Sequence, residues 1–437
     1  MPRRNVTEAP SWLEIEPKLA TAATPANELR LELRVVTPIL GGGVKARTLD
    51  EVDVIRAPSI RGQLRFWWRA LYGHGYETPE ALYDAESKIW GGVAKDARKS
   101  AIAVRVTDVR KGEKDPSDIQ PFKKGPVPKT TGAYALFPAR ALPGEVAAAR
   151  WKPGTSFTLV VRIAARLQGD ATVAAQVKRT LAAWVLFGGI GSRTRRGLGA
   201  LEPLRDTAAA LDLERFVSDE LGPSASGKER RSFAQFAGAR IHVDVASNRD
   251  AMHAWETALD WLNDFRQKAG VARDAAHPPR PGRSRWPEPD IVRRLNGADR
   301  NPQRFAHEVR YKGPLAYPRA QFGLPIIAQW QKRDRNNQQY AAGEPPAFEL
   351  KLDGHDRLAS ALIVKPLWTP QEWKACALWL ERTPPPTQVG VAQNGQLLPN
   401  SLAPFDRMPD ECSFEPLRGK ATVRDGFFDW LASRNGT

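Results

Sequence analysis

The order of periodic segments in the first half of the chain constrains its fold more than any other feature. Residues 28–36 alternate polar and apolar side chains, which is typical of a half-buried strand. Ser59 and Gly73 mark the expected start and end of the next segment, a helix. The remaining segments follow in order: that helix at 59–72, strands at 101–109 and 156–164, a helix at 170–187 and a short strand at 198–201. The order strand, helix, strand, strand, helix, strand is typical of a ferredoxin-like domain.

A second and looser copy of this order follows. We expect a strand at 239–245, a helix at 250–268, strands at 348–352 and 358–364, a helix opened by the capping box of Thr369 and Glu372, and a last strand at 389–391. The predicted fold class is therefore α+β, with two tandem ferredoxin-like (βαββαβ) domains and long loop insertions. The predicted organisation is a tail at 1–27, a first domain at 28–205, a linker at 206–235, and a second domain at 236–437 with a basic insertion at about 270–347.

The composition excludes several classes of protein. The 437 residues include 65 Lys and Arg against 49 Asp and Glu, and a net charge of +16 attracts polyanions such as nucleic acid. No stretch of about 18 or more apolar residues occurs, so no membrane span is predicted. Cys376 and Cys412 are too few for a disulfide framework or a four-cysteine zinc site. We therefore expect a reduced, cytoplasmic protein that has no membrane contact.

Arginine is concentrated in the helix predicted at 59–72. Four arginines and no acidic residue occur between residues 56 and 72, and aromatic side chains lie on the neighbouring arc. Guanidinium groups beside aromatic rings and without a counter-charge suit phosphates and stacked bases. A solvated arginine face or a subunit interface would give the same pattern, and helical spacing places Trp67 towards the core. The candidate RNA-binding residues of this segment are Arg56, Arg61, Arg65, Trp67, Trp68 and Arg69.

A glycine-rich segment at 187–201 is the second candidate site. Glycine allows the backbone to approach a ligand and expose its N–H groups, and the arginines add charge, so this loop is predicted to hold a polyanion. It lacks the Gly-Lys-Ser/Thr of a phosphate-binding P-loop and the third glycine of the dinucleotide fingerprint. An ordinary glycine-rich turn is the alternative. The candidate residues are Gly189, Gly191, Ser192, Arg193, Arg195, Arg196, Gly197 and Gly199.

The insertion adds a third basic region, because residues 280–335 contain thirteen Lys and Arg against five Asp and Glu. So long a segment without regular structure is unusual unless it has a function, although a solvated loop is the simpler interpretation.

Signals for catalysis are weak. The six histidines show no paired metal-ligand spacing, and no nucleophile motif is present. His74 is the one candidate general base for RNA cleavage, and a structural histidine at a helix end is the simpler interpretation. We therefore predict no catalytic residue, no metal site and no cofactor.

The glycine-rich loop resembles that of the RAMP superfamily of CRISPR-associated proteins. Several segments resemble one RAMP family in particular, the first subunit of the type III-B (Cmr) effector complex, and the run Arg-Phe-Trp-Trp-Arg is the most distinctive. These segments span about 28–370 and lie at 37–42, 55–71, 89–92, 282–288, 322–326 and 357–367.

The resemblance implies two tandem ferredoxin-like domains in a non-catalytic subunit at the end of the complex. Such a subunit holds the 3′ part of the CRISPR guide RNA and helps capture complementary target single-stranded RNA, and its protein partners are the other RAMP subunits. Two alternatives remain open: an endoribonuclease that processes guide RNA, and a scaffold that contacts only protein.

Overall fold

The computed structural model describes residues 28–434, apart from 44, 46, 94–96, 122–127, 168, 205, 222–231, 247, 249, 276–281 and 331–342. The predicted tail at 1–27 lies outside the described residues.

The first sheet contains four antiparallel strands in the order β3-β6-β1-β7. These strands and the two long helices between them confirm the predicted element order of the first half. Their bounds are β1 (Glu28–Val35), α2 (Ala57–Tyr72), β3 (Ile102–Arg110), β6 (Ser156–Ile163), α5 (Ala171–Phe187) and β7 (Leu201–Pro203). Ser59 is not the cap of α2 as predicted, because the helix begins two residues earlier, with Pro58 in its first turn. Asp170 caps α5 by accepting a hydrogen bond from the Val173 amide.

A helix that the sequence analysis missed, α3 (Pro79–Trp90), follows α2. The Thr78 side chain accepts a hydrogen bond from the Ala81 amide, and Pro79 occupies the first helical position. This pairing of a threonine cap with a proline at the first position is a recognised signal for a helix start.

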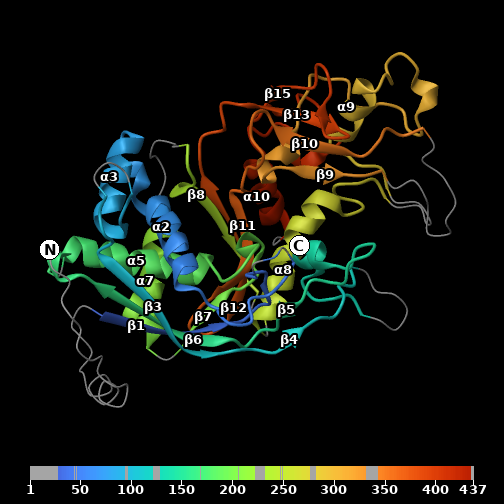
Figure 1. Ribbon diagram of the computed structural model, residues 1–437. Coiled ribbons are helices and arrows are strands. Elements are labelled where there is room, and N and C mark those ends of the chain that lie inside the picture. The colour runs from blue at the N-terminus through green and yellow to red at the C-terminus, as the bar shows by residue number, and fades with distance from the viewer. Residues whose placement is uncertain are drawn as a thin grey trace, which may run out of the picture.

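Helices α2 and α5 lie between the first sheet and a second one, as Figure 1 shows. The second sheet has three antiparallel strands in the order β11-β12-β8, with bounds β8 (Gln235–Val243), β11 (Leu362–Trp368) and β12 (Trp373–Glu381). Alternate residues of β11 face two different cores. Ile363 and Leu367 belong to the core around α2 and α5. Leu362 and Val364 belong to a second core, which α8 (Ala251–Gln267) and α10 (Val423–Arg434) cover. The two halves of the chain are therefore packed together through a shared core.

The predicted helix at Thr369 is wrong. Thr369 and Glu372 instead form the turn that joins β11 to β12, in which the Thr369 amide donates to the Glu372 carbonyl and the Glu372 amide donates to Thr369 Oγ1. A threonine side chain can accept a hydrogen bond from the amide three residues later both in a hairpin turn and at the start of a helix. The motif alone therefore does not distinguish a hairpin turn from a helix start.

The predicted last strand of the second copy belongs to a different sheet. It is β13 (Gln388–Gln393), which joins β9 (Ile326–Ala328), β10 (Phe348–Leu352), β14 (Gln396–Leu397) and β15 (Ala403–Pro404). This sheet and α9 (Glu288–Leu295) enclose a core of their own. The part of the insertion that the structure describes is therefore folded, and the fold as a whole is α+β with several antiparallel sheets.

Short elements complete the described chain. A small sheet contains β2 (Ile39–Leu40), β4 (Lys114–Asp115) and β5 (Arg150–Trp151), and α4 (Ala133–Leu136) lies near α8. The segment predicted as a linker contains α6 (Thr207–Leu211), α7 (Leu213–Leu221) and the start of β8, while 222–231 lies outside the described residues. Among the described helices, none is long and apolar enough to cross a bilayer.

Candidate nucleic-acid interface

The arginines of α2 have counter-charges that the local sequence did not reveal. Glu86 of α3 is buried and accepts hydrogen bonds from Arg65 at 2.6 Å and from Arg69 at 2.8 and 3.0 Å. Arg56 pairs with Asp50, and Arg61 is exposed and forms no ion pair with any residue that the structure describes. The expectation of an uncompensated arginine face is thus wrong for three of its four arginines.

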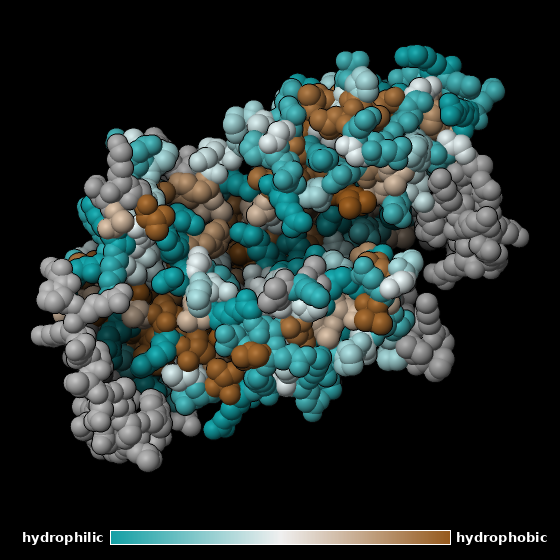
Figure 2. All heavy atoms as spheres, viewed as in Figure 1, coloured by the Kyte–Doolittle hydropathy of each residue, from teal (hydrophilic) through white to brown (hydrophobic). Residues whose placement is uncertain are grey.

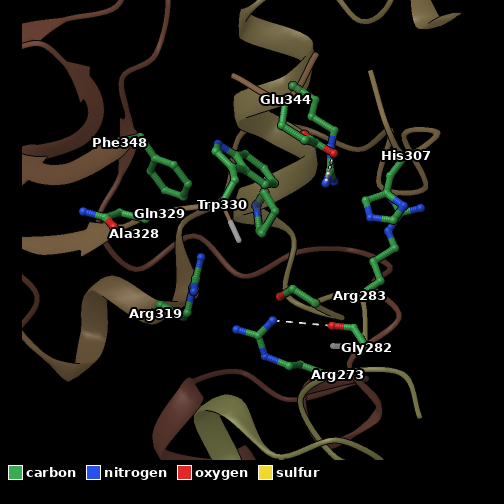
Figure 3. A pocket seen from close by; sticks show the side chains of 13 residues that line it. Arg273, Gly282, Arg283, His307, Arg319, Ala328, Gln329, Trp330, Glu344 and Phe348 are labelled. Atoms are coloured by element: carbon green, nitrogen blue, oxygen red, sulfur yellow. Dashed lines mark hydrogen bonds and ion pairs between the residues drawn. The ribbon is translucent and has the colours of Figure 1, made fainter. Parts of the chain in front are cut away.

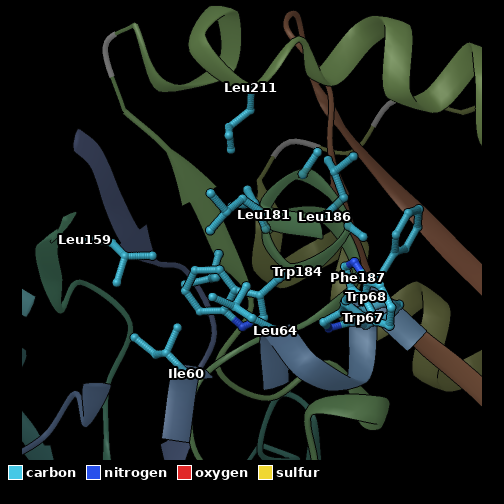
Figure 4. Close-up of a cluster of buried hydrophobic side chains, with 14 of the residues drawn as sticks. Ile60, Leu64, Trp67, Trp68, Leu159, Leu181, Trp184, Leu186, Phe187 and Leu211 are labelled. Atoms are coloured by element: carbon cyan, nitrogen blue, oxygen red, sulfur yellow. The ribbon is translucent and has the colours of Figure 1, made fainter. Parts of the chain in front are cut away.

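The two tryptophans of α2 are core residues. Trp67 is 3% exposed and Trp68 is fully buried, and Figure 4 shows both within the apolar cluster beside Phe187. The Trp68 indole donates to Gln176 of α5 at 3.0 Å, which satisfies its polar atom inside the core. Neither ring is available to stack on a base, so the prediction of both as RNA contacts is corrected.

The glycines of the loop after α5 allow close contacts within the protein. A Cβ on Gly199 would overlap the Ile190 carbonyl, and a Cβ on Gly191 would lie 2.8 Å from the Leu40 carbonyl oxygen. Both glycines have positive φ, which favours glycine independently of space. The loop amides that the sequence analysis expected to face a ligand are largely used internally, with donors at Ile190, Ser192, Arg196, Gly197 and Gly199.

Arginine side chains, rather than backbone amides, give this loop its binding potential. Arg193 is exposed, and Arg195 and Arg196 are half-buried, on the 3-10 turn Thr194–Arg196 and the residue before it. Arg266 of α8 and Arg382, directly after β12, come from the second half of the chain and interact electrostatically with these loop residues. We call these five residues the arginine cluster. None of them has an ion-pair partner within the described part of the chain.

The loop is anchored on the second half of the molecule. Arg196 donates to the Leu362 carbonyl at 2.8 Å, and the Trp255 indole donates to the Arg196 carbonyl at 2.7 Å. Beneath the loop, the buried Lys365 ammonium donates to the Gly188 carbonyl at 2.9 Å, at the C-terminal end of α5. A cation at this end is favoured by the helix dipole.

Two further contacts orient the arginines from the second half. Arg266 donates to the Tyr134 hydroxyl at 2.8 Å, and Arg382 donates to the Ala359 carbonyl at 3.0 Å. Both bonds use neutral acceptors, so the positive charge of the cluster stays uncompensated. Neither arginine was predicted, because nothing local marks residues 266 and 382 as neighbours of a loop far away in sequence.

Neighbouring protein atoms displace part of the water around the charges of the cluster. Desolvation, together with the repulsion of nearby arginines, lowers the pKa of Arg196 to about 9 and that of Arg382 to about 10. Desolvation also lowers the pKa of Arg193 and of Arg195. Guanidinium groups nevertheless stay charged at neutral pH. A bound anion would replace the lost hydration, so the geometry suits a phosphate group.

Several arginines of the insertion, in contrast, are paired with carboxylates of their own part of the fold. Arg283 donates to both carboxylate oxygens of Asp290, and Arg293 donates to Asp290 at 2.6 Å and to Glu344 at 2.9 Å. Arg319 Nε lies 3.1 Å from Glu288 Oε2, although without hydrogen-bond geometry. Arg283, Arg293 and Arg319 line a cavity of about 120 Å³, which Figure 3 shows from close by. Their arrangement serves the packing of this unit.

A hollow lined by hydrophilic residues crosses the face shown in Figure 2. It lies between the part of the molecule that carries β3, β4 and β6 and the part that carries β9, β10 and β13. In the described ranges, no group of three or more His, Cys, Asp and Glu side chains is arranged to hold a metal ion. His74 lies half-buried on the turn Gly73–Gly75, between α2 and α3.

Comparison with known proteins finds a family match in the first half of the chain. The model of the RAMP superfamily matches residues 32–202. The chain is 26% identical over 166 residues to the CRISPR system Cmr subunit Cmr1-1 of Pyrococcus furiosus, covering 37% of this chain and 44% of that protein. It is 37% identical over 89 residues to Cmr1-2 of the same organism, covering 20% and 43%. The matches thus span less than half the length of these relatives.

Two solved structures are also similar. The apo crystal structure of Cmr1 from Pyrococcus furiosus aligns with a TM-score of 0.45 at 15% identity, over 86% of this chain and 93% of that one. A chain of the type III-B Cmr-beta complex, bound to cognate target RNA and AMPPnP, aligns with a TM-score of 0.41 at 13% identity, over 80% and 94%. The first half of the chain thus matches the RAMP superfamily over residues 32–202, and part of the chain is homologous to the Cmr1 subunits of Pyrococcus furiosus.

Proposed function

We propose that this chain is a non-catalytic, RNA-binding subunit of a cytoplasmic type III-B CRISPR ribonucleoprotein. It holds the 3′ part of the guide RNA and helps capture complementary target RNA, beside the other RAMP subunits of a Cmr complex. The observation that carries the proposal is the arginine cluster, in which both halves contribute cations that have no carboxylate partner in the described residues. Both halves are interpreted as ferredoxin-like units, the second having a modified sheet.

The cluster fits the RNA backbone for a physical reason. Each guanidinium offers several donors in a plane, and their mutual repulsion and desolvation are relieved when phosphates enter. Such contacts carry no sequence information. Base pairing between guide and target supplies the specificity, as in other RNA-guided complexes.

The test measures binding of a fluorescein-labelled single-stranded RNA to the full chain by anisotropy across a salt series. We expect affinity to fall steeply with salt, and Arg193→Ala and Arg266→Ala each to weaken binding. Each lost phosphate contact should lower the slope of log affinity against log salt by about 0.7. Arg105→Ala is the matched control, because Arg105 is an exposed arginine of β3.

Two results would contradict the proposal. Absence of RNA binding at low salt would exclude direct RNA contact by this chain. If the control and both cluster variants lose the same affinity, RNA binding depends only on the net charge of the protein. The arginine cluster would then not be the binding site.

A further inference from the structure

A pocket at the C-terminal end of α2 is lined by aromatic rings. Its volume is about 480 Å³, within the range of pockets that hold small organic ligands. Four elements build it: the end of α2, the turn after it, α3, and the residues that precede β8. The side chains that carry the argument are Arg69, Tyr76, Tyr83, Glu86 and Phe233.

The three rings are held in place but remain partly accessible. Tyr83 is 37% exposed, and Tyr76 and Phe233 are half-buried. A Cβ at Gly73 would overlap the Phe233 ring, so the glycine that follows α2 allows this ring to pack against the helix end. Aromatic side chains that are fixed by packing and open on one side provide stacking surfaces at little cost in conformational entropy.

The polar groups of the pocket form one compact charged unit. Glu86 is 3% exposed and is shared by Arg65 and Arg69. Glu77 adds a second carboxylate to the lining, so the two guanidinium groups and the two carboxylates balance in charge. Arg69 lines the pocket with its side chain about one-third exposed. The pocket therefore combines apolar ring faces with a polar edge at which Arg69 is the donor.

Helix α2 connects the pocket to the arginine cluster, because Arg69 lines the pocket and Phe66 contacts Arg195 of the cluster. The Arg195 guanidinium lies 5.2 Å from the centre of the Phe66 ring. Phe66 precedes Arg69 by three residues, which places the two on adjacent turns of one helix face. A cluster that binds the backbone and an aromatic pocket for a base are the two parts of a typical single-strand binding surface.

We propose that this pocket binds one unstacked base of single-stranded RNA whose backbone lies on the arginine cluster. The inference rests on the proposed function and adds a base-binding position to it. The rings of Tyr76, Tyr83 and Phe233 supply stacking surfaces, and Arg69 offers donors to the base edge or to its phosphate. Stacking tolerates any base, so this position contributes affinity rather than sequence specificity.

The experiment uses the full chain and an oligouridine that contains a single 2-aminopurine. Binding is followed by anisotropy, and stacking by quenching of the 2-aminopurine fluorescence. We expect Tyr83→Ala to lower affinity about tenfold and to abolish the quenching while the salt dependence stays unchanged, because a stacking contact releases no counterions. Ser232→Trp places a bulky side chain at the exposed rim of the pocket and should have the same effect.

Phe137→Ala is the matched control, since Phe137 is an aromatic residue with 46% exposure outside the pocket. If the wild type binds RNA but both pocket variants behave like the control, the pocket is not a base site, and the proposed function stands. If a variant keeps its RNA affinity and loses a co-purifying protein, the pocket is a protein contact and the inference is wrong. If the wild type binds no RNA, the proposed function is wrong, and the inference that rests on it is wrong as well.

Discussion

Replacement of Lys365 by methionine tests how the second half of the chain supports the glycine-rich loop. Lys365 lies in the middle of β11 and is 1% exposed, and its ammonium group has a hydrogen bond of 2.9 Å to the Gly188 carbonyl. Desolvation lowers the pKa of this lysine from 10.5 to about 7, while the nearby Cys376 thiol acts in the opposite direction. Methionine has a similar length and removes only the charge and the donor.

The sign and size of the effect follow from this shift. The folded state releases the lysine proton near pH 7, whereas the unfolded chain keeps it up to about pH 10.5, so the unfolded state binds more protons between these values. Stability should therefore rise with pH in this window. Integration from pH 7 to pH 9 gives a gain of about 2 kcal/mol for the wild type that Lys365→Met lacks.

Urea denaturation followed by tryptophan fluorescence measures this difference at pH 7, 8 and 9. Lys374→Met is the control, because Lys374 lies on the adjacent strand β12 and its ammonium donates to the Val245 carbonyl near the surface. The control should keep the pH dependence of the wild type. Parallel profiles for the wild type and Lys365→Met would refute the burial of a titrating lysine beneath the loop.

Three further predictions follow from the described contacts. Trp68→Phe should lower the free energy of unfolding by about 1–2 kcal/mol, since a buried ring edge and its hydrogen bond are lost, and should leave RNA affinity unchanged in an anisotropy titration; a selective loss of affinity would restore Trp68 as an RNA contact. Gly199→Ala should destabilise the fold by several kcal/mol in the same urea assay, whereas Gly62→Ala, where a Cβ meets no atom within 4 Å, should stabilise it by up to about 1 kcal/mol. A metal-free incubation with precursor RNA should give no cleavage with the wild type or with His74→Ala; specific cleavage that His74→Ala abolishes would establish the endoribonuclease alternative.

The sequence alone was sufficient for elements whose signal is local and periodic. Alternation at 28–36 predicted β1, and the helical periodicity within 170–187 predicted α5, because the side-chain period reflects which face is buried. Where a local motif has two structural uses, as at Thr369 and Glu372, the sequence was not decisive. There the tertiary pairing of β11 with β12 selected the turn.

In the candidate site, too, some features could be predicted from a short segment and others depend on the tertiary structure. Local composition identified the glycine-rich loop and its three arginines, since charge and glycine content are properties of a short segment. The neutralisation of Arg65 and Arg69 by Glu86, and the addition of Arg266 and Arg382 to the loop, depend on residues far apart in the chain.

The sequence by itself therefore determined the element order of the first half, the family resemblance and the position of a basic loop. The tertiary structure decided which charges remain uncompensated and which rings remain accessible. The physical reason is that a charge is compensated, and a ring is buried, by whatever the fold brings within a few ångströms, and neither neighbour is encoded in the segment that carries the charge or the ring.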